Sequence, residues 1–177
     1  MNIPPINLKA QFKQVKGPVL RHVAEILNEQ QLILGKYCKQ LEEMIGGYVD
    51  VPCAVSCANG TDALILALMA LAIKNGDEVV TTPYTFFSTA SSVALVGARP
   101  VFVDIEPGSM NIDPDLVEQA ITPRTKAIIV VHLFGKVCNM DRILEIGQRH
   151  NLPVVEDMAQ SLGAMDEGTM CGAFGDI

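Results

Sequence analysis

Residues 126–157 read KAIIVVHLFGKVCNMDRILEIGQRHNLPVVED, and this stretch decides the fold class. It contains two apolar runs, at residues 126–131 and 152–155. Between them lie residues 139–151, where apolar side chains recur at three-to-four spacing, as in a helix, and the first residue is an asparagine, which is common at helix starts. Neither apolar run alternates with polar residues, as is typical of strands covered by helices on both faces. The stretch therefore predicts two parallel strands joined by a helix.

The same pattern extends back to residue 54. Three further β-rich runs are predicted as strands, namely AVSC at 54–57, EVVTTP at 78–83 and RPVFVDI at 99–105. Helix-length segments lie between the runs, at residues 61–76, 85–98 and 113–125. The sequence thus predicts an α/β fold with a mostly parallel sheet flanked by helices.

The first fifty residues follow a different pattern. Residues 13–30 and 35–49 have apolar residues at three-to-four spacing and are polar on one side, which predicts two surface helices. We expect residues 1–50 to form a helical segment that packs on a large domain made by residues 51–177.

Composition limits the partners. The 177 residues are 49% hydrophobic, which is enough to build a core. The net charge of −7, with basic residues scattered, argues against a nucleic-acid partner. No secretory signal is visible, and the longest apolar run, Ala63–Ile73, has 11 residues against the roughly 20 that span a bilayer. These features predict a cytoplasmic protein with no membrane partner.

The five cysteines form no C-x-x-C pair, and the three histidines lie far apart. This spacing argues against a zinc site and against a disulfide framework. We expect reduced, mostly buried thiols and no metal site.

Ligand sites of open parallel sheets lie outside the carboxyl ends of the strands. One such segment, Asn59-Gly60-Thr61, opens a predicted helix, where free N–H groups and the helix dipole could bind a phosphate. The alternative is that Asn59 or Thr61 only caps the helix and Gly60 makes a turn.

Three aromatic rings, Tyr84, Phe86 and Phe87, follow the next strand. One of them could lie flat on a planar ligand, although core packing is the commoner use of such rings. His132 ends a further strand and could reach the same crevice, although a hydrogen-bonded structural histidine is the commoner case.

Two acids end the last strand. Strand alternation sends Glu156 and Asp157 to opposite faces, so they cannot act as a catalytic pair. Asp157 and Gln160 would face the same way if a helical turn follows. A capping box, in which Asp157 caps a helix and Gln160 reaches back to it, is the alternative.

Taken together, six motifs resemble the DegT/StrS group of pyridoxal-phosphate-dependent sugar-nucleotide aminotransferases: NGTDAL, TTPYTFFST, ARPVFVDIEP, VVHLFGKVCNMDRI, VVEDMAQSLGA and CGAFGDI. The resemblance, which also includes LILGKYCKQLEE near the start, implies the fold type I large domain and a homodimer.

The resemblance also implies roles for single residues. Gly60 and Thr61 match the positions that hold the phosphate of pyridoxal 5'-phosphate, and Phe86 matches the aromatic residue stacked on its ring. Asp157 matches the acid that pairs with the pyridinium nitrogen, and Gln160 the residue near the ring hydroxyl. Glu156, on the other face, is expected to be structural.

One expected part is absent from the chain. In the family the Schiff-base lysine follows the CGAFGDI segment, whereas the last lysine here is Lys136. We therefore expect this chain to be the N-terminal half of such an enzyme, without the small C-terminal domain and inactive alone.

The resemblance implies that the full-length protein moves an amino group, from glutamate, to a keto group of a nucleotide-linked sugar. Two alternatives stay open: a sugar dehydratase of the same family that uses pyridoxal or pyridoxamine phosphate, and a regulatory or binding relative without catalysis. The residue at the lysine position would decide between amino transfer and dehydration.

Overall fold

The computed structural model describes residues 6–177, so the first five residues of the predicted N-terminal segment lie outside it. The chain forms two compact units, of which the first ends at Met44 and the second comprises Ile45–Ile177. Both predicted N-terminal helices are present, as α1 (Leu8–Glu29) and α2 (Lys36–Val49). That this segment packs on the large domain stays a prediction.

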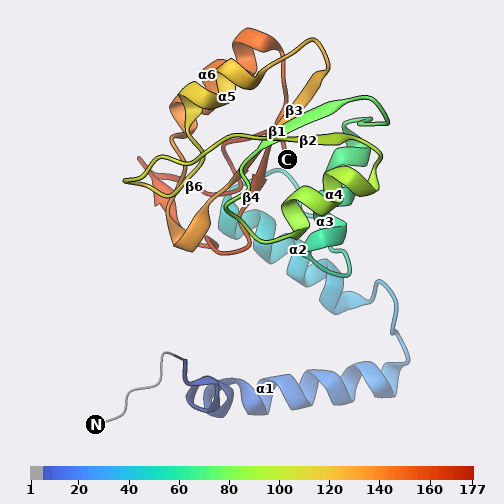
Figure 1. Cartoon of the computed structure of the whole chain (residues 1–177). Helices are drawn as coiled ribbons and strands as arrows, with labels where there is room; N and C mark the ends of the chain where they lie inside the picture. The colour runs from blue at the N-terminus through green and yellow to red at the C-terminus, as the bar shows by residue number, and fades with distance from the viewer. Residues whose placement is uncertain (1–5) are drawn as a thin grey trace. The chain divides into compact units, whose positions relative to one another are not determined.

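The second unit is built around a parallel sheet of four strands in the order β2-β1-β3-β4 (Figure 1). Its strands are β1 (Glu78–Thr81), β2 (Arg99–Phe102), β3 (Thr125–Val131) and β4 (Val154–Asp157). The helices are α3 (Gly60–Ala70), α4 (Ser88–Leu95), α5 (Pro114–Ala120) and α6 (Met140–His150), with a short 3-10 turn, η1, at Leu133–Gly135. The predicted α/β class and parallel sheet are confirmed.

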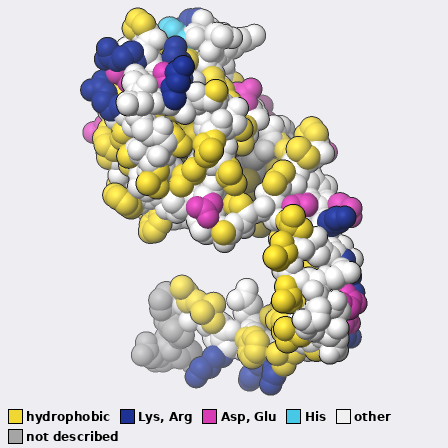
Figure 2. All heavy atoms as spheres, turned by 90° about the vertical axis from the view of Figure 1, so that its right-hand side faces the viewer, with side chains coloured by type: hydrophobic (Ala, Val, Ile, Leu, Met, Phe, Trp, Pro, Cys, Tyr) yellow, Lys and Arg dark blue, Asp and Glu magenta, His cyan; other side chains and the backbone are white. Residues whose placement is uncertain are grey.

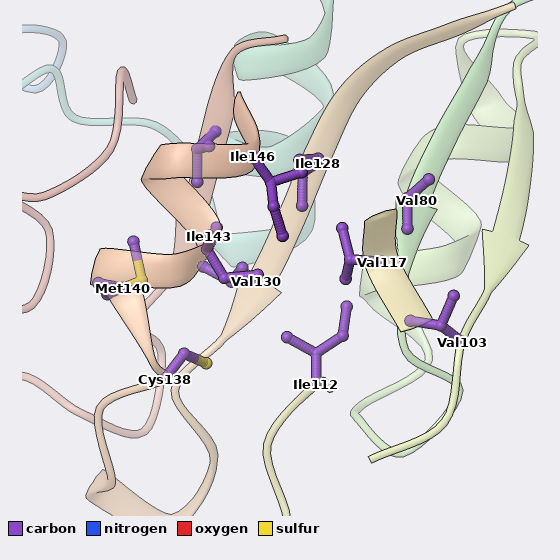
Figure 3. Close-up of a cluster of buried hydrophobic side chains, with 11 residues drawn as sticks. Val80, Val103, Ile112, Val117, Ile128, Val130, Cys138, Met140, Ile143 and Ile146 are labelled. Atoms are coloured by element: carbon purple, nitrogen blue, oxygen red, sulfur yellow. The ribbon is translucent and has the colours of Figure 1, made fainter. Parts of the chain in front are cut away.

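Helices cover both faces of the sheet, and successive strand residues point to opposite sides, so each strand contributes to two clusters of buried side chains. One face packs against α5 and α6 through the cluster shown in Figure 3, which includes Val80, Ile128, Val130, Val154, Val117, Ile143 and Ile146. The other face packs against α3 and α4 through Val79, Ala127, Ile129, Val155, Leu64, Leu68 and Val93. Glu156 therefore continues the first face and Asp157 the second.

The predicted strand at residues 54–57 is wrong. This segment has no regular secondary structure and belongs to neither sheet, and Val55 is 82% exposed. Apolar residues favour a strand only where a neighbouring strand completes the backbone ladder, and the local pattern does not show whether such a neighbour exists.

A second, two-stranded sheet was not predicted. β5 (Met165–Asp166) and β6 (Thr169–Met170) pair antiparallel across Glu167 and Gly168, which both have positive φ angles of 46° and 88°. Two successive positive φ angles suit a tight hairpin.

The cysteines differ from expectation, since only Cys138 and Cys171 of the five are buried. All five are free thiols, and burial raises the pKa of the Cys138 thiol to about 12. Among residues 6–177, no group of His, Cys, Asp and Glu side chains could hold a metal ion. In the same residues, no helix is long and apolar enough to cross a membrane.

Candidate functional site

The start of α3 presents open backbone N–H groups. Asn59 is the N-cap, and its Oδ1 accepts a hydrogen bond from the Asp62 amide at 3.0 Å. Gly60 and Thr61 are the first two helical residues, whose N–H groups have no acceptor within the helix. Apart from its chain neighbours and the backbone of its own helix, nothing lies within 4 Å of the place where a Gly60 Cβ would stand. The helix start therefore leaves room for an anion after capping is complete.

A second helix begins beside the first. The Thr61 hydroxyl lies 2.7 Å from the hydroxyl of Ser88, which is the first residue of α4. Phe87, the N-cap of α4, makes no side-chain cap bond. Two helix N-termini and two hydroxyl groups thus meet at one place, which favours a negatively charged ligand group.

Asp157 is half-buried at the end of β4 and faces α4. Its Oδ2 accepts a hydrogen bond from the Thr89 hydroxyl at 3.1 Å, and its Oδ1 accepts one from the Ala159 amide at 3.3 Å. Thr89 is itself buried and lies 3.0 Å, hydroxyl to hydroxyl, from Thr85. The carboxylate is thus fixed in direction, and each of its oxygens keeps a free lone pair.

The capping-box interpretation of Asp157 and Gln160 is wrong. Turns rather than a helix follow β4, and Gln160 does not reach back to Asp157. Its Oε1 accepts a hydrogen bond from the backbone N–H of Phe134 at 3.0 Å. Gln160 therefore links the segment after β4 to the segment after β3.

The aromatic rings after β1 do not pack in the core. Phe86 is 73% and Phe87 78% exposed, and Tyr84 is also exposed. Helix α4 begins only at Ser88, so these rings precede it and lie at the sheet edge. A recess of about 340 Å³ lies beside them and is lined by residues 83–86, 133–134 and 160.

His132 does not reach the crevice, because its side chain is completely buried. Its Nδ1 accepts a hydrogen bond from the Cys138 amide at 3.0 Å, so the Nε2–H donates to Glu156 at 2.8 Å. Here the structural interpretation of His132 is the correct one.

The Glu156 carboxylate also accepts hydrogen bonds from the backbone amides of Gly172, Phe174 and Gly175, at 2.6–2.9 Å. Burial alone would raise the pKa of Glu156, but the hydrogen bonds from His132, Gly175 and Gly172 outweigh it and hold this pKa below its ordinary value. The group is therefore a buried anion that fixes residues 172–175, in line with its expected structural role.

Sequence reasoning missed three residues of this edge. Ser88 and Thr89 could have been found from the run of hydroxyl residues STASS at a helix entry. Phe134 could not be found from the sequence, because its backbone has a left-handed conformation that phenylalanine rarely adopts.

The family profile of the DegT/DnrJ/EryC1/StrS aminotransferases matches residues 14–177. The chain belongs to this family. Among relatives, it is 46% identical to a pleiotropic regulatory protein of Geobacillus stearothermophilus, over 99% of this chain and 47% of that protein. It is also 46% identical to a UDP-2-acetamido-2-deoxy-3-oxo-D-glucuronate aminotransferase of Pseudomonas aeruginosa, over 92% of this chain and 45% of that protein.

Solved structures of family members have a similar fold. A DegT/DnrJ/EryC1/StrS aminotransferase from Brucella abortus has a TM-score of 0.94 and 40% identity, over 98% of this chain and 48% of that one. NtdA from Bacillus subtilis, solved with bound cofactor PMP, has a TM-score of 0.82 and 37% identity, over 86% of this chain and 35% of that one. The chain thus spans about half the length of the family members it matches.

Proposed function

We propose that the whole protein is a pyridoxal-phosphate-dependent aminotransferase that moves an amino group from glutamate to a keto group of a nucleotide-linked sugar. Family membership supports the reaction class, and the Pseudomonas aeruginosa relative supports the sugar substrate. The observation that carries the proposal is the Asp157 carboxylate, which is held by Thr89 at the same sheet edge as the open starts of α3 and α4.

The residues present fit the cofactor. Gly60 and Thr61 would hold its phosphate, because the helix start offers N–H groups, a hydroxyl and open space. The exposed Phe86 ring would pack on the pyridine ring, and the Nε2 of Gln160 would donate to the ring hydroxyl. A metal has no part in this proposal.

Asp157 has the central chemical role. When bound, the cofactor supplies an electron sink for the negative charge that develops at the substrate Cα. Asp157, as an anion with both oxygens oriented, would keep the proton on the ring nitrogen. Such a charge-assisted contact contributes about 1.5–3 kcal/mol. The family resemblance further supports a cytoplasmic homodimer.

The test uses the whole protein loaded with pyridoxal phosphate. Glutamate alone should convert the cofactor to its amine form, seen as a change in absorbance, and a nucleotide-linked keto sugar should reverse the change. A dehydratase would instead release water from the sugar without consuming glutamate.

A second candidate is a regulatory protein of the same fold, which the Geobacillus stearothermophilus relative favours. It predicts cofactor or nucleotide binding without any glutamate-dependent change in absorbance. That result would contradict the proposed amino transfer.

A further inference from the structure

Asn111 is a buried asparagine in the loop after β2. It is 2% exposed and precedes Ile112, whose side chain belongs to the core cluster of Figure 3. The Asn111 carbonyl accepts a hydrogen bond from the Glu106 amide at 2.9 Å, and the Asn111 amide donates one to the Ser109 hydroxyl at 3.1 Å. The backbone of Asn111 is therefore fixed, so its side chain can hold a neighbouring segment in place.

Both ends of the Asn111 side-chain amide bind the segment after β3. Its Oδ1 accepts a hydrogen bond from the Leu133 amide at 3.2 Å, and its Nδ2 donates one to the Lys136 carbonyl at 3.0 Å. The first partner can only donate and the second can only accept, which fixes the orientation of the Asn111 side chain. Because a buried amide without partners is unfavourable, these bonds hold residues 133–136 against Asn111.

The segment held by Asn111 has a backbone conformation that local preference does not favour. Phe134 has φ 56° and ψ 24°, and Gly135 has φ 81°, so two successive residues are left-handed. Phenylalanine rarely adopts this conformation, and such strain persists where the surroundings impose it. The two bonds of Asn111 supply this constraint, because they bind Leu133 and Lys136 on either side of the left-handed pair.

This conformation directs a backbone donor at Gln160. The Phe134 N–H donates to Gln160 Oε1 at 3.0 Å, and a Cβ on Gly135 would stand 3.6 Å from the Gln160 carbonyl oxygen, so the two segments lie close together. A backbone N–H can only donate, so it selects the oxygen of the Gln160 side chain. The Nε2 of Gln160 is thereby left for the ring hydroxyl of the cofactor.

We infer that Asn111 is a positioning residue for the cofactor site. It holds residues 133–136 so that the Phe134 N–H fixes the Gln160 side chain with Nε2 toward the ring hydroxyl. The inference rests on the proposed function, because it needs the proposed contact between Gln160 and the cofactor. Asn111 itself touches neither Gln160 nor the cofactor in this account and acts through the segment after β3.

A pair of cofactors tests the inference in the whole protein: pyridoxal phosphate, and its analogue with hydrogen in place of the ring hydroxyl. Asn111→Ala should weaken the binding of pyridoxal phosphate about tenfold, as loss of one oriented hydrogen bond allows, and leave binding of the analogue within about twofold. Equal losses for the two cofactors, or no loss for either, would overturn the inference.

Two further variants separate this effect from a general loss of stability. Asn111→Asp keeps the acceptor for Leu133 but loses the donor for Lys136, so it should show a smaller difference of the same sign if the alanine variant folds poorly. Asn139→Ala is the control, because Asn139 caps α6 through the Arg142 amide at 3.3 Å. It should leave the ratio of the two dissociation constants unchanged; a change as large as that in Asn111→Ala would overturn the inference.

Hydrogen exchange tests the role of Asn111 without any cofactor. In the cofactor-free whole protein, the amides of residues 133–136 should exchange at least about tenfold faster in Asn111→Ala than in the parent, because the segment opens more readily. Unchanged exchange would overturn the inference whether or not a cofactor binds. Failure of the proposed function would look different, since the parent protein would then bind neither pyridoxal phosphate nor its analogue.

Discussion

The hydroxyl of buried Thr89 donates a hydrogen bond to the carboxylate of Asp157, with Oγ1 and Oδ2 3.1 Å apart. The two residues are 68 positions apart in sequence, and the bond joins the start of α4 to the end of β4. It fixes the acid on the face of the sheet that α3 and α4 cover.

Thr89→Val should weaken cofactor binding by the whole protein about tenfold. Valine has the same shape but leaves Asp157 Oδ2 without its donor, and a hydrogen bond to a charged group contributes about 1.5–3 kcal/mol. Titration with pyridoxal phosphate measures the change. Thr89→Ser keeps the hydroxyl and should bind within about threefold of the parent; a loss as large as that of the valine variant would show that packing, not the hydrogen bond, is responsible.

Glu156→Gln should destabilise the 177-residue chain by about 3 kcal/mol. An amide has one acceptor oxygen, whereas the carboxylate accepts from His132 and three backbone amides, so the substitution leaves buried donors unpaired. Urea unfolding gives the difference in free energy. Glu167→Gln, at an exposed turn, is the control, and both variants within 0.5 kcal/mol of the parent would be incompatible with a buried anionic anchor.

Gly172→Ala should cost more stability than Gly168→Ala. Both glycines have a positive φ, of 91° and 88°, so alanine is strained at both. Only at Gly172 would the new Cβ also collide, 2.5 Å from Met158 Sδ, whereas nothing lies within 4 Å at Gly168. Overpacking adds about 1–3 kcal/mol. Equal losses in thermal unfolding would show that the Met158 side chain moves aside freely.

Stability should fall in acid partly because of Glu78. Hydrogen bonds from Thr122 and Arg124, and then from Arg99, outweigh burial and lower the pKa of Glu78 from 4.5 to about 2. An acid whose pKa is lower in the folded than in the unfolded state stabilises the folded protein at pH values above its unfolded pKa. For Glu78 this contribution is lost as the pH falls from about 4.5 to about 2. Glu78→Gln should flatten the curve of unfolding free energy in this window. If the variant's unfolding free energy changed with pH in this window as steeply as that of the parent, the low pKa of Glu78 would be contradicted.

The sequence allowed the fold and part of the site to be predicted, for physical reasons that differ between residues. Asp157 and Glu156 could be separated because side chains alternate along any strand. The strand expected at 54–57 failed because pairing depends on a neighbour that the local pattern cannot show.

The buried contacts of the site were not predictable. Glu156 accepts hydrogen bonds from His132 and from the amides of Gly172, Phe174 and Gly175, and these partners are 16 to 24 residues away, so no local spacing connects them. The outward ring of Phe134 was missed because apolar composition favours burial, whereas here the left-handed backbone of the segment after β3 leaves this ring exposed.

The central claim is that Asp157 controls the charge of the cofactor ring, and Asp157→Asn tests it most directly. In the whole protein this variant should unfold at nearly the same temperature as the parent and still bind pyridoxal phosphate. Its rate for the glutamate half-reaction should fall about 100-fold or more, because the neutral amide no longer stabilises the protonated ring nitrogen; a loss of about 2.7 kcal/mol corresponds to this factor. A rate within a few-fold of the parent would contradict the account.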